Sequence, residues 1–230
     1  MRRLAPWAML AVALAACRGP STPTPPATPP PLADVIEAIF LGSGPLAAGD
    51  CVSPGILATP LRNTTFTVVI GTTIDAAGRR TIEDAITDVQ QVNSGRFRLV
   101  VERSGAADPL PGPLQITSAD VPDATIQMLC SPGGSGCTRG LTFNGASITS
   151  ARCVQRIGTS PRLKAHEFGH AIGLCHVDRD RMPAAVMAPS PGTMAQDRFS
   201  ALELDAIRAV YGSGLEAGAT RADFERAGLR

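Results

Sequence analysis

Histidine, lysine and aromatic residues are scarce in this chain of 230 residues. It contains three histidines, aromatic residues make up 4%, and Lys164 is the one lysine. So few aromatic rings leave no evident platform on which sugars or nucleic-acid bases could stack. The net charge is +1, with acidic and basic residues interspersed, which argues against nucleic acid or an acidic polymer as the partner.

The chain also lacks an apolar run long enough to cross a membrane as a mature helix. Arg2 and Arg3 precede the apolar residues 4–16, which have the layout of a secretory signal. Residues 14–17, LAAC, resemble the bacterial lipobox, whose cysteine is lipidated and becomes the new N-terminus. We therefore expect a signal peptide over 1–16 and a lipid anchor at Cys17, in a bacterial cell envelope. Ordinary cleavage within residues 13–15, giving a secreted protein, is the alternative.

The next segment is dominated by proline, threonine and alanine and cannot build a core. Residues 17–32 therefore predict a lipidated cysteine followed by a semi-extended tether that reaches about 3 Å per residue. Residues 33–212 are long enough for one domain with a normal core. Residues 213–230 fit two alternatives, a short helix through residues 222–226 or disorder. We assign no function to this segment.

All three histidines fall in one short segment, residues 166–176, which read HEFGHAIGLCH. His166 and His170 are spaced i, i+4, so on a helix both imidazoles can reach one metal ion. Glu167 lies beside them, where its carboxylate could take a proton from a metal-bound water. Gly173 can adopt the left-handed conformation that ends a helix, and the turn would bring in His176 as the third ligand. Three protein ligands leave tetrahedral zinc one open position for water, as in catalytic sites.

This extended HExxHxxGxxH motif resembles the signature of the metzincin metalloproteases, in which a methionine-containing turn follows. Met187 stands where that turn would place the floor of the zinc site, and Pro189 follows two residues later, as is typical of the matrixins, the matrix metalloprotease group. The resemblance is strong over residues 160–212 and schematic before them. It implies peptide hydrolysis of a peptide or protein substrate, with one catalytic zinc, and with residues 188–191 forming part of the pocket wall.

The chain also departs from the matrixin pattern. Cys51 does not lie in the propeptide segment PRCGxPD that caps the zinc in matrixin zymogens, so we expect it in a disulfide. The acidic and glycine-rich loops that bind calcium in many relatives are not evident, so the sequence does not support a Ca²⁺ site, although calcium stays open. We expect a monomer. A surface-anchored zinc-binding or adhesin-like module without turnover is the alternative function, although such a module has no use for Glu167 as a base.

Cysteine usage fits an exported protein, in which disulfides persist. Cys130 and Cys137 flank a turn-forming loop and are expected to pair. Among the others, Cys153 with Cys175 would brace the metal-bearing helix, and Cys51 with Cys153 is the alternative. Sequence alone does not fix the connectivity.

Apolar and β-branched patterns predict an α+β fold. We expect strands over 65–70, 97–101, 114–117, 125–129 and 147–150. Helices are expected over 81–92, with Gly95 as a stop, from Ser160 as N-cap and Pro161 at the first turn, and over 199–212. This order is similar to that of the metzincin catalytic domain, which implies a twisted mixed sheet with a backing helix, an active-site helix and a C-terminal helix.

Overall fold

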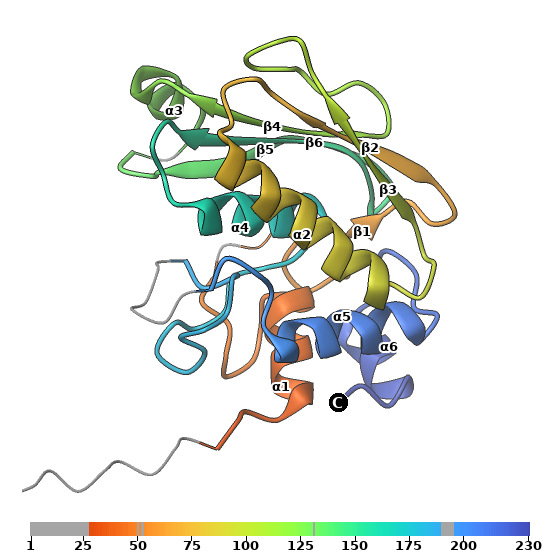
Figure 1. Ribbon diagram of the computed structural model, residues 1–230. Helices are drawn as coiled ribbons and strands as arrows, with labels where there is room; N and C mark the ends of the chain where they lie inside the picture. The colour runs from red at the N-terminus through yellow and green to blue at the C-terminus, as the bar shows by residue number, and fades with distance from the viewer. Residues whose placement is uncertain (1–27, 50, 52, 131, 190–195) are drawn as a thin grey trace, which may run out of the picture.

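The computed structural model describes residues 28–49, 51, 53–130, 132–189 and 196–230 (Figure 1). The expected signal peptide, the anchor Cys17 and most of the tether lie outside this part of the chain. No helix of the described residues is long and apolar enough to cross a membrane.

Six strands form one mixed sheet, the sheet type that the family resemblance implies, and two of the strands, β1 and β5, are not among those predicted. Their order is β1-β6-β4-β2-β3, all parallel along this path, and β5 pairs antiparallel with β6. The strands are β1 (Thr59–Pro60), β2 (Thr65–Ile70), β3 (Arg98–Arg103), β4 (Gln115–Val121), β5 (Gly136–Asn144) and β6 (Ser147–Arg156).

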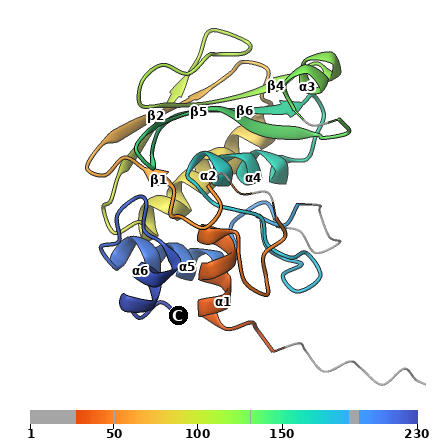
Figure 2. The same cartoon turned by 180° about the vertical axis from the view of Figure 1, so that it is seen from behind.

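Helix α3 lies at one end of the sheet, and the other helices lie below the sheet in two levels (Figures 1 and 2). Helices α2 and α4 lie next to the sheet, and α1, α5 and α6 lie beyond them at the opposite end of the molecule. The helices are α1 (Leu32–Ile36), the π-helix η1 (Glu37–Leu41), α2 (Ala76–Val92), α3 (Asp123–Leu129), α4 (Pro161–Ala171), α5 (Ala201–Gly212) and α6 (Arg221–Arg226).

Helix α2 begins five residues before the predicted start. Asp75 is its N-cap, and the side chain accepts a hydrogen bond of 2.7 Å from the backbone N–H of Gly78. The buried face of the helix includes Ile82, Ile86 and Val89 and packs toward α4 and α5. Helix α2 is thus the backing helix that the pattern predicts, and its apolar stripe fixes where α4 lies.

The strand predicted over residues 125–129 is wrong, because this segment belongs to helix α3. Pro122 at the N-cap has a φ of −58°, and Asp123 lies in the first turn, where its charge complements the helix dipole. Only Ile126 is buried among the seven residues of α3. One buried residue is enough to pack a short helix against β6. A strand would instead show buried and exposed side chains in alternation.

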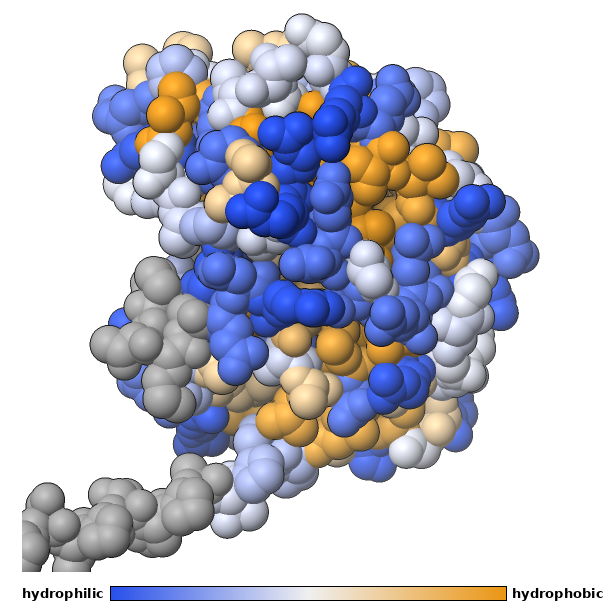
Figure 3. Space-filling model, in the orientation of Figure 1, coloured by the Kyte–Doolittle hydropathy of each residue, from blue (hydrophilic) through white to orange (hydrophobic). Residues whose placement is uncertain are grey.

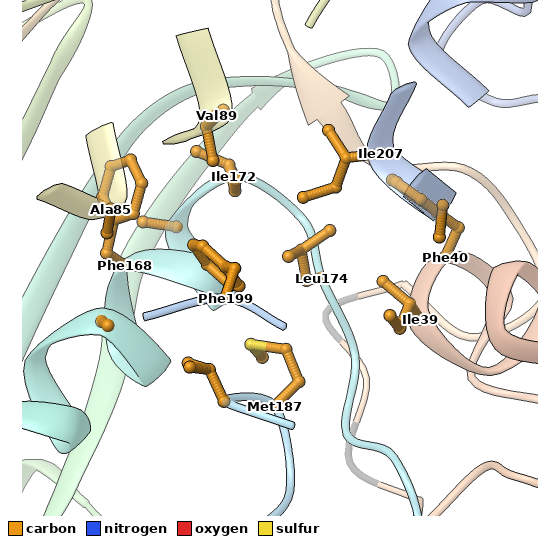
Figure 4. Packing of buried hydrophobic residues seen from close by; sticks show 14 of the residues in the cluster. Ile39, Phe40, Ala85, Val89, Phe168, Ile172, Leu174, Met187, Phe199 and Ile207 are labelled. Carbon is orange, nitrogen blue, oxygen red and sulfur yellow. The ribbon is translucent and has the colours of Figure 1, made fainter. Parts of the chain in front are cut away.

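On the face shown in Figure 3, hydrophilic residues run across the middle of the molecule. Apolar residues form separate patches above and below them. The large apolar side chains lie inside instead, in one main cluster between the sheet and the helices. Figure 4 shows part of that cluster, where Phe168, Ile172 and Leu174 meet Met187 and Phe199.

Residues 213–230 pack on the domain. The backbone N–H of Leu57 donates to Ala219 O at 2.8 Å, and Phe224 of α6 is fully buried. Arg221 and Arg230 form ion pairs of 3.2 and 2.7 Å with the buried carboxylate of Glu37 in η1. Burial of a phenylalanine ring contributes about 1.5 to 3 kcal/mol, so this segment stabilises the fold.

The disulfides differ in part from the sequence expectation. Cys130 pairs with Cys137, as the short loop between them suggests, with 5.7 Å between their Cα atoms. Cys175 pairs with Cys51, and Cys153 is a buried free thiol. Both pairings considered for Cys153 are therefore wrong. Cys153 points from β6 toward α4, where its Sγ lies 3.4 Å from Glu167 O, whereas Cys51 reaches Cys175 across a separation of 124 residues.

Candidate metal centre

Helix α4 carries the first two histidines and Glu167. It begins at Pro161, where the sequence predicts, although the Ser160 side chain makes no capping hydrogen bond. His166 and Glu167 are buried, and His170 is half-buried one turn later. The i, i+4 spacing places the imidazoles of His166 and His170 on one face, with ring centroids 4.8 Å apart.

Gly173 ends this helical segment and redirects the chain. Its φ is +96°, in the left-handed region, and a Cβ at this position would overlap the carbonyl oxygen of Ala58. The backbone N–H of Leu174 then donates to Gly169 O at 2.9 Å. Only glycine meets both requirements. The turn returns the chain to the site and places His176 beside the two helical histidines.

The three imidazoles converge through their Nε2 atoms. His176 Nε2 lies 3.0 Å from Nε2 of His166 and 3.0 Å from Nε2 of His170. The other ring nitrogens of the helical pair face carbonyls, with His166 Nδ1 at 2.7 Å from Val186 O and His170 Nδ1 at 2.7 Å from Leu174 O. A carbonyl accepts only, so each of these Nδ1 atoms carries the proton and each Nε2 of the helical pair is a bare lone pair.

Electrostatics favour the neutral rings. Burial and the neighbouring histidines lower the pKa of His166 well below its usual range, and burial lowers the pKa of His170 to about 4. Neutral imidazoles whose lone pairs point at one another repel unless a cation lies between them. This donor set fits zinc, which takes neutral histidine nitrogens at about 2.0 to 2.1 Å in a tetrahedron. The fixed Nδ1 partners supply the outer hydrogen bonds that metal-ligating histidines almost always make.

Glu167 lies next to the histidines but is held by β5. Its Oε2 accepts a hydrogen bond of 3.0 Å from Oγ1 of Thr138, and the same hydroxyl lies 2.7 Å from the backbone oxygen of Glu167. Burial raises the pKa of the Glu167 carboxyl to about 8, and the bond from Thr138 opposes that shift. A divalent cation at the histidines would also oppose it, because a nearby positive charge favours the carboxylate.

Met187 lies beneath the site, fully buried, in a turn that two buried charged residues hold. The Glu203 carboxylate accepts from the N–H of Met187 at 2.9 Å and from that of Val186 at 3.1 Å. Arg162 Nη2 donates to the carbonyls of Ala185, Val186 and Ala188 at 2.7, 3.0 and 3.1 Å. Since Val186 O also accepts from His166, this turn sets the orientation of a candidate ligand.

The site opens into a cleft of about 820 Å³. One wall is the first part of β5 with the residues before it, including Gly134, Thr138 and Leu141. The N-terminal half of α4 lines another part, and Ala188 and Pro189 also line the cleft. The rest of the expected pocket wall, residues 190–191, falls outside the described residues.

Three residues of the site were not singled out by the sequence patterns: Thr138, Arg162 and Glu203. For Glu203 a signal existed, because Ser200 and Glu203 form the capping box that begins α5. Thr138 lies in a strand without apolar alternation, and its contact with Glu167 spans 29 residues, so no local pattern marks it.

No protein-family model matches the chain, and no curated protein matches it in sequence. Among solved structures, it is similar to high choriolytic enzyme 1, a hatching enzyme zinc-protease from the medaka fish Oryzias latipes. The match has a TM-score of 0.38 and 14% identity, over 64% of this chain and 89% of that one. It is also similar to metalloproteinase-II from Bacteroides fragilis, with a TM-score of 0.40 and 14% identity, over 67% of this chain and 54% of that one. The chain thus spans about half of that second protein. Likenesses this distant carry no argument about function.

Proposed function

We propose that this protein is a zinc-dependent endopeptidase of the metzincin type, similar to the matrixins. The observation that carries the proposal is the convergence of three imidazoles beside the buried carboxylate of Glu167 in an open cleft, with Nε2 of His176 at 3.0 Å from Nε2 of each helical histidine. A purely structural zinc site has four protein ligands and is closed. Here the described ligands number three, His166, His170 and His176, and they face the cleft.

Zinc bound there would supply a Lewis acid that lowers the pKa of a water and polarises a substrate carbonyl. Glu167 would accept the proton of the attacking water and later give it to the amine that leaves. Thr138 would keep the carboxylate aimed into the site by its hydrogen bond to Oε2. Positioned proton transfer of this kind contributes about 10²- to 10⁴-fold in rate.

Strand β5 offers a place for an extended substrate. It pairs with β6 along one edge, and among the described residues no strand pairs with its other edge. Residues 136–139 of this strand line the cleft. A peptide added to the free edge would gain backbone hydrogen bonds and pass the metal centre in an extended conformation.

Metal removal tests the proposal. We expect the purified protein to hold about one zinc per chain and to cleave some members of a diverse peptide library. Dialysis against a chelator should abolish cleavage, and one equivalent of Zn²⁺ should restore it. A protein that holds zinc but cleaves no peptide would favour the binding module instead. Cleavage that survives complete zinc removal would contradict a metal-dependent mechanism.

A further inference from the structure

The charge on the wall of the cleft is positive once the catalytic groups are set aside. Among the described lining residues, the charged side chains are Arg139, Arg162 and Glu167. Glu167 belongs to the metal centre, and Arg162 is buried against the carbonyls of the Met187 turn. Arg139 therefore carries the one exposed charge of this lining set.

Arg139 is not neutralised by its neighbours. Within the described chain, no carboxylate forms an ion pair with it, and its partner across the β5–β6 ladder is a second arginine, Arg152. Arg152 is paired with Asp108. Asp108 thus pairs with Arg152 alone, and the charge without an ion-pair partner among the described residues lies on Arg139, in the strand with the free edge.

The geometry of β5 decides what this charge can contact. Side chains alternate along a strand, so Arg139 lies on the face opposite to that of Thr138, which contacts Glu167. A peptide paired with the free edge would place the residue opposite Arg139 on this same face. The register shift between Arg139 and Thr142, with Gly140 at a φ of +58°, bends the strand directly after Arg139. Arg139 is therefore the last residue beside the cleft that pairs with β6 before the register shift.

We propose that Arg139 selects substrates that carry an acidic residue at the position paired with it on β5. The inference rests on the proposed endopeptidase function and names the substrate class of that site: peptides with aspartate or glutamate at one fixed position relative to the cleaved bond. Opposite charges across a strand pair attract and like charges repel. In addition, an uncompensated cationic wall speeds the encounter with an anionic ligand, in a manner that salt screens.

The experiment is a charge scan in a quenched peptide that the parent protein cleaves at one bond. Glutamate or lysine is placed at each flanking position in turn, and kcat/KM is measured for each peptide. We expect one position at which glutamate is preferred over the neutral parent residue by about 1.4- to 5-fold. At that position lysine should be disfavoured, and the preference should shrink as salt is raised.

Charge reversal assigns the preference. In Arg139→Glu, the ratio of kcat/KM for the glutamate peptide to that for the lysine peptide should fall at this one position and pass below one. Arg98→Glu is the matched control: it makes the same charge change on an exposed residue of β3, the strand at the other end of the sheet. Its profile should equal that of the parent. An unchanged profile in Arg139→Glu, or an equal change in Arg98→Glu, would overturn the assignment.

The two proposals can fail separately. If the parent cleaves neutral peptides but shows no charge preference, the endopeptidase function stands and the role of Arg139 is wrong. If the parent cleaves nothing, fluorescence anisotropy with the same peptides still tests the arginine: tighter binding of the glutamate peptide, lost in Arg139→Glu, supports it, and equal binding of all peptides overturns it.

Discussion

Thr138 donates a hydrogen bond of 3.0 Å from its Oγ1 to Oε2 of Glu167, and so ties the candidate proton acceptor on α4 to strand β5. The same strand forms one wall of the cleft. The group that would move the proton and the strand that would hold the peptide are therefore fixed to each other. We expect a change at Thr138 to affect catalysis more than metal binding.

Thr138→Val removes this hydroxyl while keeping the shape of the side chain. A hydrogen bond to a charged group contributes about 1.5 to 3 kcal/mol, so we expect kcat/KM to fall by about 10- to 100-fold, with zinc content unchanged. Thr138→Ser should restore most of the activity because it restores the hydroxyl. Thr142→Val is the control, since the Thr142 hydroxyl contacts Thr149 and Ser150 instead of Glu167. Equal losses in the two valine variants would contradict a specific role of Thr138.

His176 distinguishes the extended motif from a plain HExxH helix. His176→Ala leaves two imidazoles, so zinc measured by mass spectrometry after dialysis should drop sharply, and activity should drop with it. Full zinc occupancy and full activity in this variant would mean that another residue is the third ligand. The metzincin assignment would then be lost.

Glu203 supports the turn beneath the metal centre. Glu203→Ala removes the acceptor of the N–H groups of Val186 and Met187, and an unsatisfied buried donor costs about 1 to 3 kcal/mol. We expect a lower free energy of unfolding by at least about 2 kcal/mol in denaturant titrations. Ser213→Ala, at an exposed residue just after the same helix, is the control. A Glu203→Ala protein as stable as the parent would show that the turn does not depend on this carboxylate.

We also propose that Cys17 anchors the protein in the envelope membrane, a prediction from the residues LAAC at 14–17 and the proline-rich segment behind them. Cys17→Ser should move the protein from the membrane fraction to the soluble one, measured by immunoblot after detergent phase partitioning. Identical partitioning of parent and variant would remove the lipid anchor and favour a secreted form.

The sequence predicts those parts of the site that local spacing determines. The i, i+4 histidines and the left-handed Gly173 are local features, and the structure places them where their spacing implies. Strand β2 and the stripe of α2 follow from apolar periodicity in the same way. The strand prediction over residues 125–129 is wrong because this short apolar run satisfies both a strand and a helix pattern, and the local signals of a helix start, Pro122 and Asp123, lie just before it.

The contacts that complete the site are long-range and carry no local pattern. Strand β5 is mostly polar and exposed, so it does not show the alternation by which strands are recognised. The Cys51–Cys175 pair depends on how η1 lies against residue 175, where the backbone N–H of Cys175 donates to Ile39 O at 2.7 Å. Neither contact follows from the residues beside it in the chain.

In the proposed mechanism, Glu167 moves a proton during peptide hydrolysis without being a zinc ligand. This role is tested most directly by measuring zinc content and cleavage of a quenched peptide together, in the parent and in Glu167→Ala. We predict about one zinc per chain in both proteins, retained peptide binding in the variant, and a loss of kcat of at least about 10²- to 10⁴-fold. Undiminished cleavage by Glu167→Ala would contradict the account.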